Sequence, residues 1–191
     1  MVLQSEGELG PQGLGKEERR ELDLYYLDET GFTLTPAVPY AWQKKGVRLE
    51  CLSTSNGKRQ SVLGLLSKRG GFQCYITEGT VTSQLVIACI DAFVKQRKRS
   101  GIQRPLVIVL DNASMHTSAM LRERAVEWKR QSVRLQYLPP YSPELNLIEI
   151  LWRRIKYAWL PLDAYSSWQK LTDSIEFVLK NIGSKYQISF A

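Results

Sequence analysis

The sequence predicts an α/β fold in which helices flank a mixed β-sheet. Three observations predict it: short apolar runs rich in β-branched residues, apolar residues at helical spacing between the later runs, and turn-forming residues at the boundaries. Of the 191 residues 43% are hydrophobic, which is enough to bury one sizeable core. Residues 1–20 are rich in Gly, Glu and Lys without an apolar period, so they predict a flexible lead-in to a single domain at residues 21–191.

The first predicted strand carries two acidic residues at its C-terminal end. Residues 22–27 form a short, β-prone apolar run that reaches Asp28 and Glu29. Gly31 follows and is expected to break the strand. The pattern therefore indicates a buried strand that delivers carboxylates to one edge of the sheet.

Two further strands are predicted as an antiparallel hairpin. The apolar runs at residues 61–66 and 72–77 are separated by the turn sequence of residues 67–71, which contains two glycines. Before them, residues 32–58 contain prolines and glycines among aromatic and basic residues. This composition predicts loops and a small hairpin around residues 42–52.

Helices then alternate with strands. Residues 82–98 carry apolar residues three and four positions apart, which is typical of an amphipathic helix. Residues 105–110 are almost purely apolar and end at Asp111, which indicates a strand buried on both faces. Residues 118–130 predict a second helix, with Ser118 as its N-cap.

The last part of the chain predicts one more strand and two helices. Residues 133–138 form the strand, which Pro139 and Pro140 terminate. Pro143 begins a helix, and residues 168–182 form the final one. The apolar face of the helix from Pro143 comprises Leu145, Ile148, Leu151, Trp152, Ile155 and Trp159. The predicted order is three strands, a helix, a strand, a helix, a strand and then helices. This is the order of the ribonuclease-H-like fold.

The charge distribution favours a nucleic-acid partner. Residues 1–30 hold eight acidic and three basic side chains, so the overall net charge of +7 leaves +12 for residues 31–191. A basic body attracts polyanions, and contacts to phosphates position DNA without reading its sequence. The side chains expected to contribute are Lys44, Lys45, Lys58, Arg59, Lys95, Arg97, Lys98, Arg99, Arg153, Arg154 and Lys156, with Trp42 as a possible stacking residue and packing as its alternative role.

Several classes of protein are excluded by composition. Cys51, Cys74 and Cys89 are odd in number and lack a Cys-x-x-Cys pair, which argues against a disulfide framework and a zinc ribbon. His116 is the only histidine, so a metal site built from imidazoles is excluded. With no apolar leader and no membrane-length apolar run, we expect a soluble protein in a reducing, intracellular compartment.

Three acids are candidates for a shared metal site. Two-metal phosphodiester chemistry needs acidic oxygens that converge where two ions sit about 4 Å apart. Asp28 and Asp111 end two strands that we expect to be neighbours, and Glu149 in the helix after Pro143 is the natural third acid. The intervals are 82 residues between the first two acids and 37 between the last two.

Other roles stay open for nearby residues. Glu29 could substitute for Asp28, but the alternation of side chains along a strand points it to the opposite side of the sheet. Glu144 is the reserve candidate for the third acid, and a favourable charge in a first helical turn is its alternative role. Glu149 has an alternative as the exposed ion-pair partner of Arg153.

The loop after Asp111 holds two further polar candidates. Asn112 either orients Asp111 or forms a turn. His116 is interpreted as a polar loop residue near the site, with the orientation of DNA or of a metal-bound water as its alternative role.

Three blocks of the sequence resemble a known family. Residues 26–31 (YLDETG), 109–116 (VLDNASMH) and 138–146 (LPPYSPELN) resemble the motif blocks of DDE transposases of the Tc/mariner superfamily, especially the bacterial insertion-sequence branch. The resemblance covers about residues 22–160. The third block, which continues through Glu149, is the most specific.

The resemblance has implications for fold, chemistry and partners. It implies a ribonuclease-H-like fold and two Mg²⁺ or Mn²⁺ ions held by Asp28, Asp111 and Glu149. It also implies nicking of double-stranded DNA at transposon ends, strand transfer into TA target sites, and a homodimer when assembled on DNA. The location that it implies is the cytoplasm, in association with the bacterial nucleoid. Two departures stand out: Leu147 occupies a position where the family often has proline, and the family's N-terminal helix-turn-helix region is not found in this sequence.

Three functions remain to be separated. The first is an active metal-dependent transposase or endonuclease, which retention of all three acids favours. The second is a truncated or inactive relative that acts as a DNA-binding or assembly module. The third is a ribonuclease-H-like nuclease that acts on RNA or branched DNA.

Overall fold

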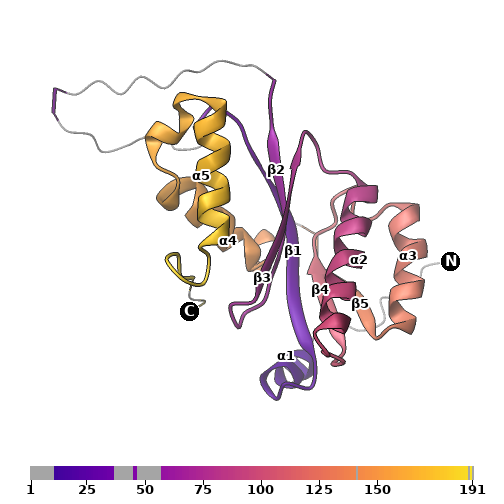
Figure 1. The fold of residues 1–191 in the computed structure, drawn as a ribbon. Helices are drawn as coiled ribbons and strands as arrows, with labels where there is room; N and C mark the ends of the chain where they lie inside the picture. Colours follow the sequence, from indigo (N-terminus) through magenta and orange to yellow (C-terminus); the bar gives the residue numbers. More distant parts are fainter. Residues whose placement is uncertain (1–10, 37–44, 47–56, 141, 189, 191) are drawn as a thin grey trace.

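A five-stranded mixed sheet forms the centre of the protein (Figure 1). The computed structural model describes residues 11–36, 45–46, 57–140, 142–188 and 190. Along the chain the strands are β1 Asp23–Phe32, β2 Gln60–Leu66, β3 Phe72–Glu78, β4 Leu106–Leu110 and β5 Val133–Tyr137. In space they follow the order β3-β2-β1-β4-β5. The mixed α/β sheet that the sequence predicts is therefore confirmed.

The central strand β1 pairs differently on its two sides. It is antiparallel to β2, and this pairing continues to Phe32 opposite Gln60. It is parallel to β4 only from Asp23 to Tyr26, whose partner is Val109. Because β4 ends soon after Val109, the second half of β1 extends beyond the C-terminal end of β4.

Helices cover both faces of the sheet (Figure 1). One face carries α2 Ser83–Arg99 and α3 Ala119–Arg130. The other carries α4 Ile148–Arg154 and α5 Trp168–Lys180, with the short segments η1 Pro143–Leu145, η2 Ile155–Trp159 and η3 Leu162–Ser166. Each face has its own hydrophobic core, so the sheet separates two packed layers.

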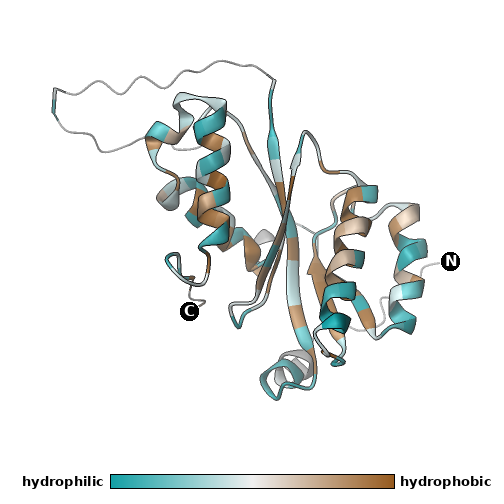
Figure 2. Cartoon of the chain, viewed as in Figure 1, coloured by the Kyte–Doolittle hydropathy of each residue, from teal (hydrophilic) through white to brown (hydrophobic). Residues whose placement is uncertain are grey.

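Side chains of β1 alternate between these two cores. Leu24 and Tyr26 belong to the core under α4 and α5, whereas Leu27 belongs to the core under α2 and α3. By the same alternation Asp28 faces the α4 side and Glu29 faces the α2 side. Figure 2 shows hydrophobic residues both on the strands and on the helices that cover them. The membership of the two cores fits the alternation expected for Asp28 and Glu29.

Helix starts agree with the sequence. Thr82 and Ser118 have extended backbones, and their hydroxyl oxygens accept backbone N–H groups of the first turns of α2 and α3. Ser167 caps α5 in the same way. The helices predicted at residues 82–98 and 118–130 are thus confirmed to within one residue.

The first strand is longer than its local sequence predicts. Gly31, expected to break it, lies inside β1 and pairs with Ser61 of β2. The Arg59 guanidinium lies directly over Gly31. Pairing with β2 outweighs the weak strand propensity of glycine at this position.

Part of the predicted flexible lead-in is helical. Within residues 1–20, the segment Pro11–Glu18 forms α1. Arg69, in the turn between β2 and β3, donates hydrogen bonds to the carbonyl oxygens of Glu17 and Glu18 at the end of this helix. A long-range contact thus orders a stretch that lacks an apolar period, while the domain boundary at residue 21 stays a prediction.

The helix predicted from Pro143 is three consecutive segments, η1, α4 and η2. Asn146 is buried between the first two, and its carbonyl oxygen accepts the N–H of Glu149 at 3.0 Å. Leu145, predicted on the apolar face, is 48% exposed. The chain therefore turns once before α4 begins, and only the later part of the predicted stripe is buried.

Some expectations lie outside the described residues. The hairpin around residues 42–52 falls there almost entirely, as do Trp42, Lys44 and Cys51. Within the described part of the chain, none of the helices combines the length and apolar character that crossing a membrane requires.

Candidate active site

Asp28 is placed at the site by the pairing of β1. It lies two residues beyond Tyr26, the last residue paired with β4, and it is opposite Gly64 of β2. A Cβ atom on Gly64 would lie 2.6 Å from the Trp152 ring of α4. The absence of a side chain at Gly64 therefore lets α4 pack closely against the sheet beside Asp28.

Asp111 reaches the same edge from β4. It follows Leu110 directly and lies two residues beyond Val109, the partner of Tyr26. The register and the alternation of side chains thus place Asp28 and Asp111 at equivalent positions on the same face of neighbouring parallel strands. The expectation that these strands are neighbours is confirmed.

Glu149 approaches from the helical layer. It is the second residue of α4 and is partly buried. Together with Asp111 it lines a pocket of about 380 Å³, whose remaining walls are Asn112, Leu138, Pro139, Pro140 and Ser142. The second and third motif blocks therefore form one concavity, which Asp28 adjoins from the neighbouring strand.

The charges of the three acids influence one another. Burial raises the pKa of Asp28 to about 8, assisted by the negative charges of Glu29, Asp111 and Glu149. Burial likewise raises the pKa of Glu149, with Arg153 opposing the shift and Asp111 adding to it. A position where carboxylates raise each other's pKa is one where a cation is favoured.

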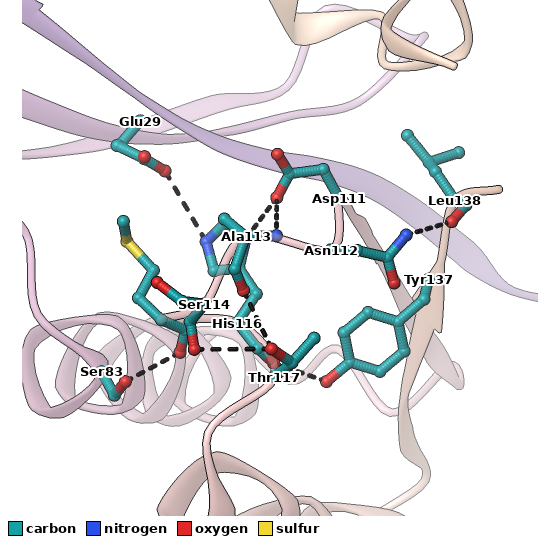
Figure 3. A network of polar contacts seen from close by, with 11 residues as sticks. Glu29, Ser83, Asp111, Asn112, Ala113, Ser114, His116, Thr117, Tyr137 and Leu138 are labelled. Atoms are coloured by element: carbon teal, nitrogen blue, oxygen red, sulfur yellow. Dashed lines mark hydrogen bonds and ion pairs between the residues drawn. The ribbon is translucent and has the colours of Figure 1, made fainter. Parts of the chain in front are cut away.

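Asp111 is the exception among the three. The hydrogen bond from His116 lowers its pKa, with a further contribution from the N–H of Ala113. His116 Nδ1 lies 2.6 Å from Asp111 Oδ1, and the Ala113 nitrogen lies 3.1 Å from the same oxygen (Figure 3). Asp111 is therefore held as an ionised carboxylate.

The donor chemistry fits a hard divalent cation. Carboxylate oxygens are the ligands that Mg²⁺ and Mn²⁺ accept, and Mg²⁺ is commonly held by one or two of them together with water. In the described part of the chain, no three His, Cys, Asp or Glu side chains are already gathered closely enough to hold an ion. The three acids thus lie at one edge of the sheet and interact electrostatically, but they do not form a closed coordination shell.

His116 lies in the loop after β4, as predicted, and it is buried there. Its side chain is fully inaccessible, and its Nε2 lies 3.7 Å from Glu29 Oε2 on the α2 side of the sheet. The burial was not predicted, because it depends on the contact of this loop with β1. The one available signal was the position of a single histidine five residues after an acid.

The side chain of Asn112 bonds to the segment that follows β5. Its Nδ2 donates to the carbonyl oxygen of Leu138 at 2.6 Å. This bond ties the segment after β4 to the segment after β5 and so holds the two walls of the pocket together.

The alternative roles of two glutamates can now be examined. Glu144 is exposed in η1 and is not among the residues that line the pocket with Asp111. Glu149 forms no ion pair with Arg153 within the described residues. The Arg153 charge only opposes the rise in the pKa of Glu149 that burial causes. Glu149 is thus the better placed third acid.

Basic side chains adjoin the acidic edge. Lys156 of η2 lies with its ammonium 5.5 Å from the ring centroid of Phe32. Burial and the charge of Arg59 lower the pKa of Lys156, while Asp28 acts in the opposite direction. Arg59 and Arg153, whose charges act on Lys156 and Glu149, are exposed near this edge. Lys58 and Arg154 are exposed as well.

Arg97 does not belong with the predicted phosphate contacts. It is 7% exposed, and its Nη1 lies 2.7 Å from Asp23 Oδ2 at the start of β1. Its role is structural because a partly buried acid already neutralises it. Lys95, Lys98 and Arg99, from the same helix end, are exposed.

Comparisons with known proteins agree with this arrangement. Residues 23–172 match the family described as DDE superfamily endonuclease. A curated relative from Shigella sonnei, the "Insertion element IS630 uncharacterized 39 kDa protein", is 23% identical over 137 residues. The match covers 71% of this chain and 38% of the relative, so the chain spans well under half of the relative's length.

Solved structures share the fold at low sequence identity. The Mos1 transposase paired-end complex with left transposon end aligns with a TM-score of 0.59 and 13% identity, over 94% of this chain and 58% of that one. A simian T-cell lymphotropic virus intasome aligns with a TM-score of 0.55 and 14% identity, over 88% and 51%. The fold is thus the ribonuclease-H-like fold of transposases and integrases, and the chain belongs to the DDE superfamily endonuclease family.

Proposed function

We propose that this chain is the catalytic domain of a DNA transposase, in which Asp28, Asp111 and Glu149 hold two Mg²⁺ or Mn²⁺ ions. The observation that carries the proposal is the meeting of three motif blocks at one edge of the sheet. Asp28 and Asp111 lie at equivalent positions of adjacent parallel strands, and Glu149 shares a pocket with Asp111. Membership of the endonuclease family supports the same reading.

The metal requirement follows from the charge of the site. Three carboxylates face one region, and burial and mutual repulsion raise the pKa of Asp28 and of Glu149. When bound, two divalent cations activate the attacking oxygen and stabilise the leaving oxygen of a phosphodiester. The protein's part is to present oxygen donors on rigid elements, two from strands and one from the first turn of a helix.

Positive side chains next to the acids are proposed to hold the DNA backbone. Lys156 is partly buried beside the acidic edge, and Arg59 and Arg153 are exposed near it. Contacts of this kind fix the position of a duplex independently of its sequence and weaken steeply with salt. The substrate that we infer is double-stranded DNA.

The wider activity is part of the same proposal. Nicking at transposon ends, transfer of the freed 3′-hydroxyl into target DNA and assembly as a homodimer on DNA are drawn from the family resemblance. The printed description of the Mos1 complex, a paired-end complex with a transposon end, supports this view by analogy.

The test is metal-dependent nicking of supercoiled plasmid DNA. We expect nicking with Mg²⁺ or Mn²⁺, none with EDTA, and none in Asp111→Ala. Asp173→Ala, which removes an exposed acid of α5, is the matched control and should nick as the unaltered protein does. Nicking that survives Asp111→Ala would reject the assignment.

A second function is a DNA-binding or assembly module without catalysis. It is favoured by one observation, that no three potential ligands in the described chain are already close enough to hold an ion. In this case DNA binding would persist, while Mn²⁺ binding and nicking would both be absent. The plasmid assay, run beside a gel-shift assay, separates the two functions.

A further inference from the structure

Glu29, His116 and Asp111 form a line of polar side chains behind the acidic edge (Figure 3). We propose that Glu29 and the buried His116 are a positioning pair, which fixes one oxygen of Asp111 and leaves the other to face the pocket. The inference rests on the proposed function of Asp111 as a metal ligand. It assigns a role to two residues outside the three acids.

The two oxygens of Asp111 have different surroundings. Oδ1 receives both hydrogen bonds, from His116 Nδ1 at 2.6 Å and from the Ala113 N–H at 3.1 Å. An ionised carboxylate only accepts hydrogen bonds, so Nδ1 carries the proton. Oδ2 points away from this network in Figure 3, and the Asp111 side chain is 49% exposed. One oxygen is thus anchored and the other is available.

His116 is itself immobilised. Its side chain is 0% exposed, and its backbone carbonyl accepts the Tyr137 hydroxyl of β5 at 2.7 Å. Its backbone N–H donates to the carbonyl oxygen of Ala113 at 2.9 Å. The imidazole therefore cannot swing away from Asp111 without disturbing a loop that is bonded at several points.

Glu29 completes the line from the central strand. Its Oε2 lies 3.7 Å from His116 Nε2, and neither atom has a hydrogen-bond partner within the described chain. The separation exceeds hydrogen-bond distance, so the two side chains face each other across a short gap. Since Glu29 follows Asp28 in β1, the line links the two segments that carry Asp28 and Asp111.

A structural role and a positioning role for His116 lead to different expected results. Groups that orient a metal ligand from behind typically change metal affinity or activity by about 10–100-fold when removed. A histidine that only stabilises the loop changes the melting temperature and leaves the affinity of the folded protein alone. Mn²⁺ affinity, measured by electron paramagnetic resonance without DNA, is therefore the deciding quantity.

The variants separate hydrogen bonding from packing. His116→Leu removes both ring nitrogens, whereas His116→Asn keeps a donor near the position of Nδ1. Ser83→Ala is the matched control, because it removes a hydrogen bond to the Met115 carbonyl of the same loop but touches neither His116 nor Asp111. We expect Mn²⁺ binding at least about tenfold weaker in His116→Leu, within about threefold of the unaltered value in His116→Asn, and unchanged in Ser83→Ala.

The role of Glu29 is tested by a double-mutant cycle. Glu29→Gln should weaken Mn²⁺ binding in the unaltered background and have no further effect in the His116→Leu background, because Glu29 acts through His116. Should His116→Leu not fold, the cycle is run with His116→Asn, which no longer reaches Glu29. Additive effects in either cycle would reject the pairing of Glu29 with His116.

The single histidine also permits a direct reading of the contact. In ¹⁵N NMR of the metal-free protein we expect one imidazole with protons on both ring nitrogens, Nδ1 toward Asp111 and Nε2 toward Glu29, and Mg²⁺ should shift its signals. A folded His116→Leu protein with unaltered Mn²⁺ affinity, or an unprotonated Nδ1, overturns the inference. Absence of both Mn²⁺ binding and nicking in the unaltered protein instead overturns the proposed function.

Discussion

Strand β1 carries one aspartate at each end of its apolar segment, and the two have opposite surroundings. Asp23, at the start, lies 2.7 Å from Arg97 and 3.1 Å from Arg104. Asp28, five residues later, has no ion-pair partner within the described chain. The charges that shift its pKa are those of three other acids.

Their proton affinities differ accordingly. Burial works against ionisation of Asp23, but the hydrogen bonds from Arg97 and Arg104 hold its pKa below the ordinary range. For Asp28 burial and neighbouring negative charges act in the same direction, and the pKa reaches about 8. The comparison separates an acid that the fold has neutralised from one that it has left available for a cation.

The largest effect expected from this comparison is on catalysis. Asp28→Asn should reduce metal-dependent nicking by at least about 1,000-fold, because loss of a metal ligand removes several kcal/mol of transition-state stabilisation. Asp23→Asn makes the same chemical change in the same strand and should leave the rate within about threefold at a temperature where both variants are folded. Equal losses in the two variants would remove the distinction between the ends of β1.

The second effect is on stability, and here Asp23 rather than Asp28 is the important residue. Asp23→Asn leaves the buried Arg97 guanidinium without its carboxylate, and this should lower the free energy of unfolding by about 2–4 kcal/mol. Because the folded-state pKa of Asp23 is lowered, its contribution is complete above the unfolded value of about 4 and is lost as the pH falls through the folded value. Urea unfolding at pH 7 and pH 3 should show a difference between variant and parent that shrinks in acid.

The third effect concerns the helix that closes the site. Gly64→Ala places a Cβ atom 2.6 Å from the Trp152 ring, so α4 must move away from the sheet opposite Asp28. We expect a loss of about 1–3 kcal/mol in stability together with reduced nicking, since Glu149 moves with α4. Adding Trp152→Phe, which shortens the colliding ring, should restore part of both. If stability falls and nicking does not, the position of α4 is not important for catalysis.

The smallest effect is a gain in stability. The pKa of Asp28 is about 8 in the folded protein and about 4 when unfolded, so ionisation increasingly favours the unfolded state as the pH rises between these values. Asp28→Asn should therefore raise the metal-free melting temperature at pH 7 by a few degrees, about 2–8 °C. Mg²⁺ should raise the melting temperature of the unaltered protein more than that of the variant. A lower melting temperature in Asp28→Asn would show that the ionised acid has a partner.

Much of the fold was predictable because its signals are local. The hairpin of β2 and β3, the capped starts of α2 and α3, and the strand before Asp111 each depend on a short stretch of sequence. The order of these elements was sufficient to place Asp28 and Asp111 on neighbouring strands. Alternation along β1 then separated Asp28 from Glu29.

The features that were missed depend on contacts between distant segments. Gly31 stays in β1 because β2 pairs with it, and α1 ends where Arg69 binds its last carbonyl groups. Arg97 is a surface charge by its local sequence, because its partner Asp23 lies far away along the chain. His116 lies under β1 only because the loop after β4 turns back, and no local pattern encodes that turn.

Crystals soaked in Mn²⁺ test the shared acidic site most directly, since the ion is located by its anomalous scattering. We expect Mn²⁺ between the carboxylates of Asp28 and Asp111, with Asp111 coordinating through Oδ2 while Oδ1 keeps its bond to His116. Soaked crystals in which these two carboxylates stay apart and metal-free, at a concentration that supports nicking, would contradict the metal site and the function proposed from it.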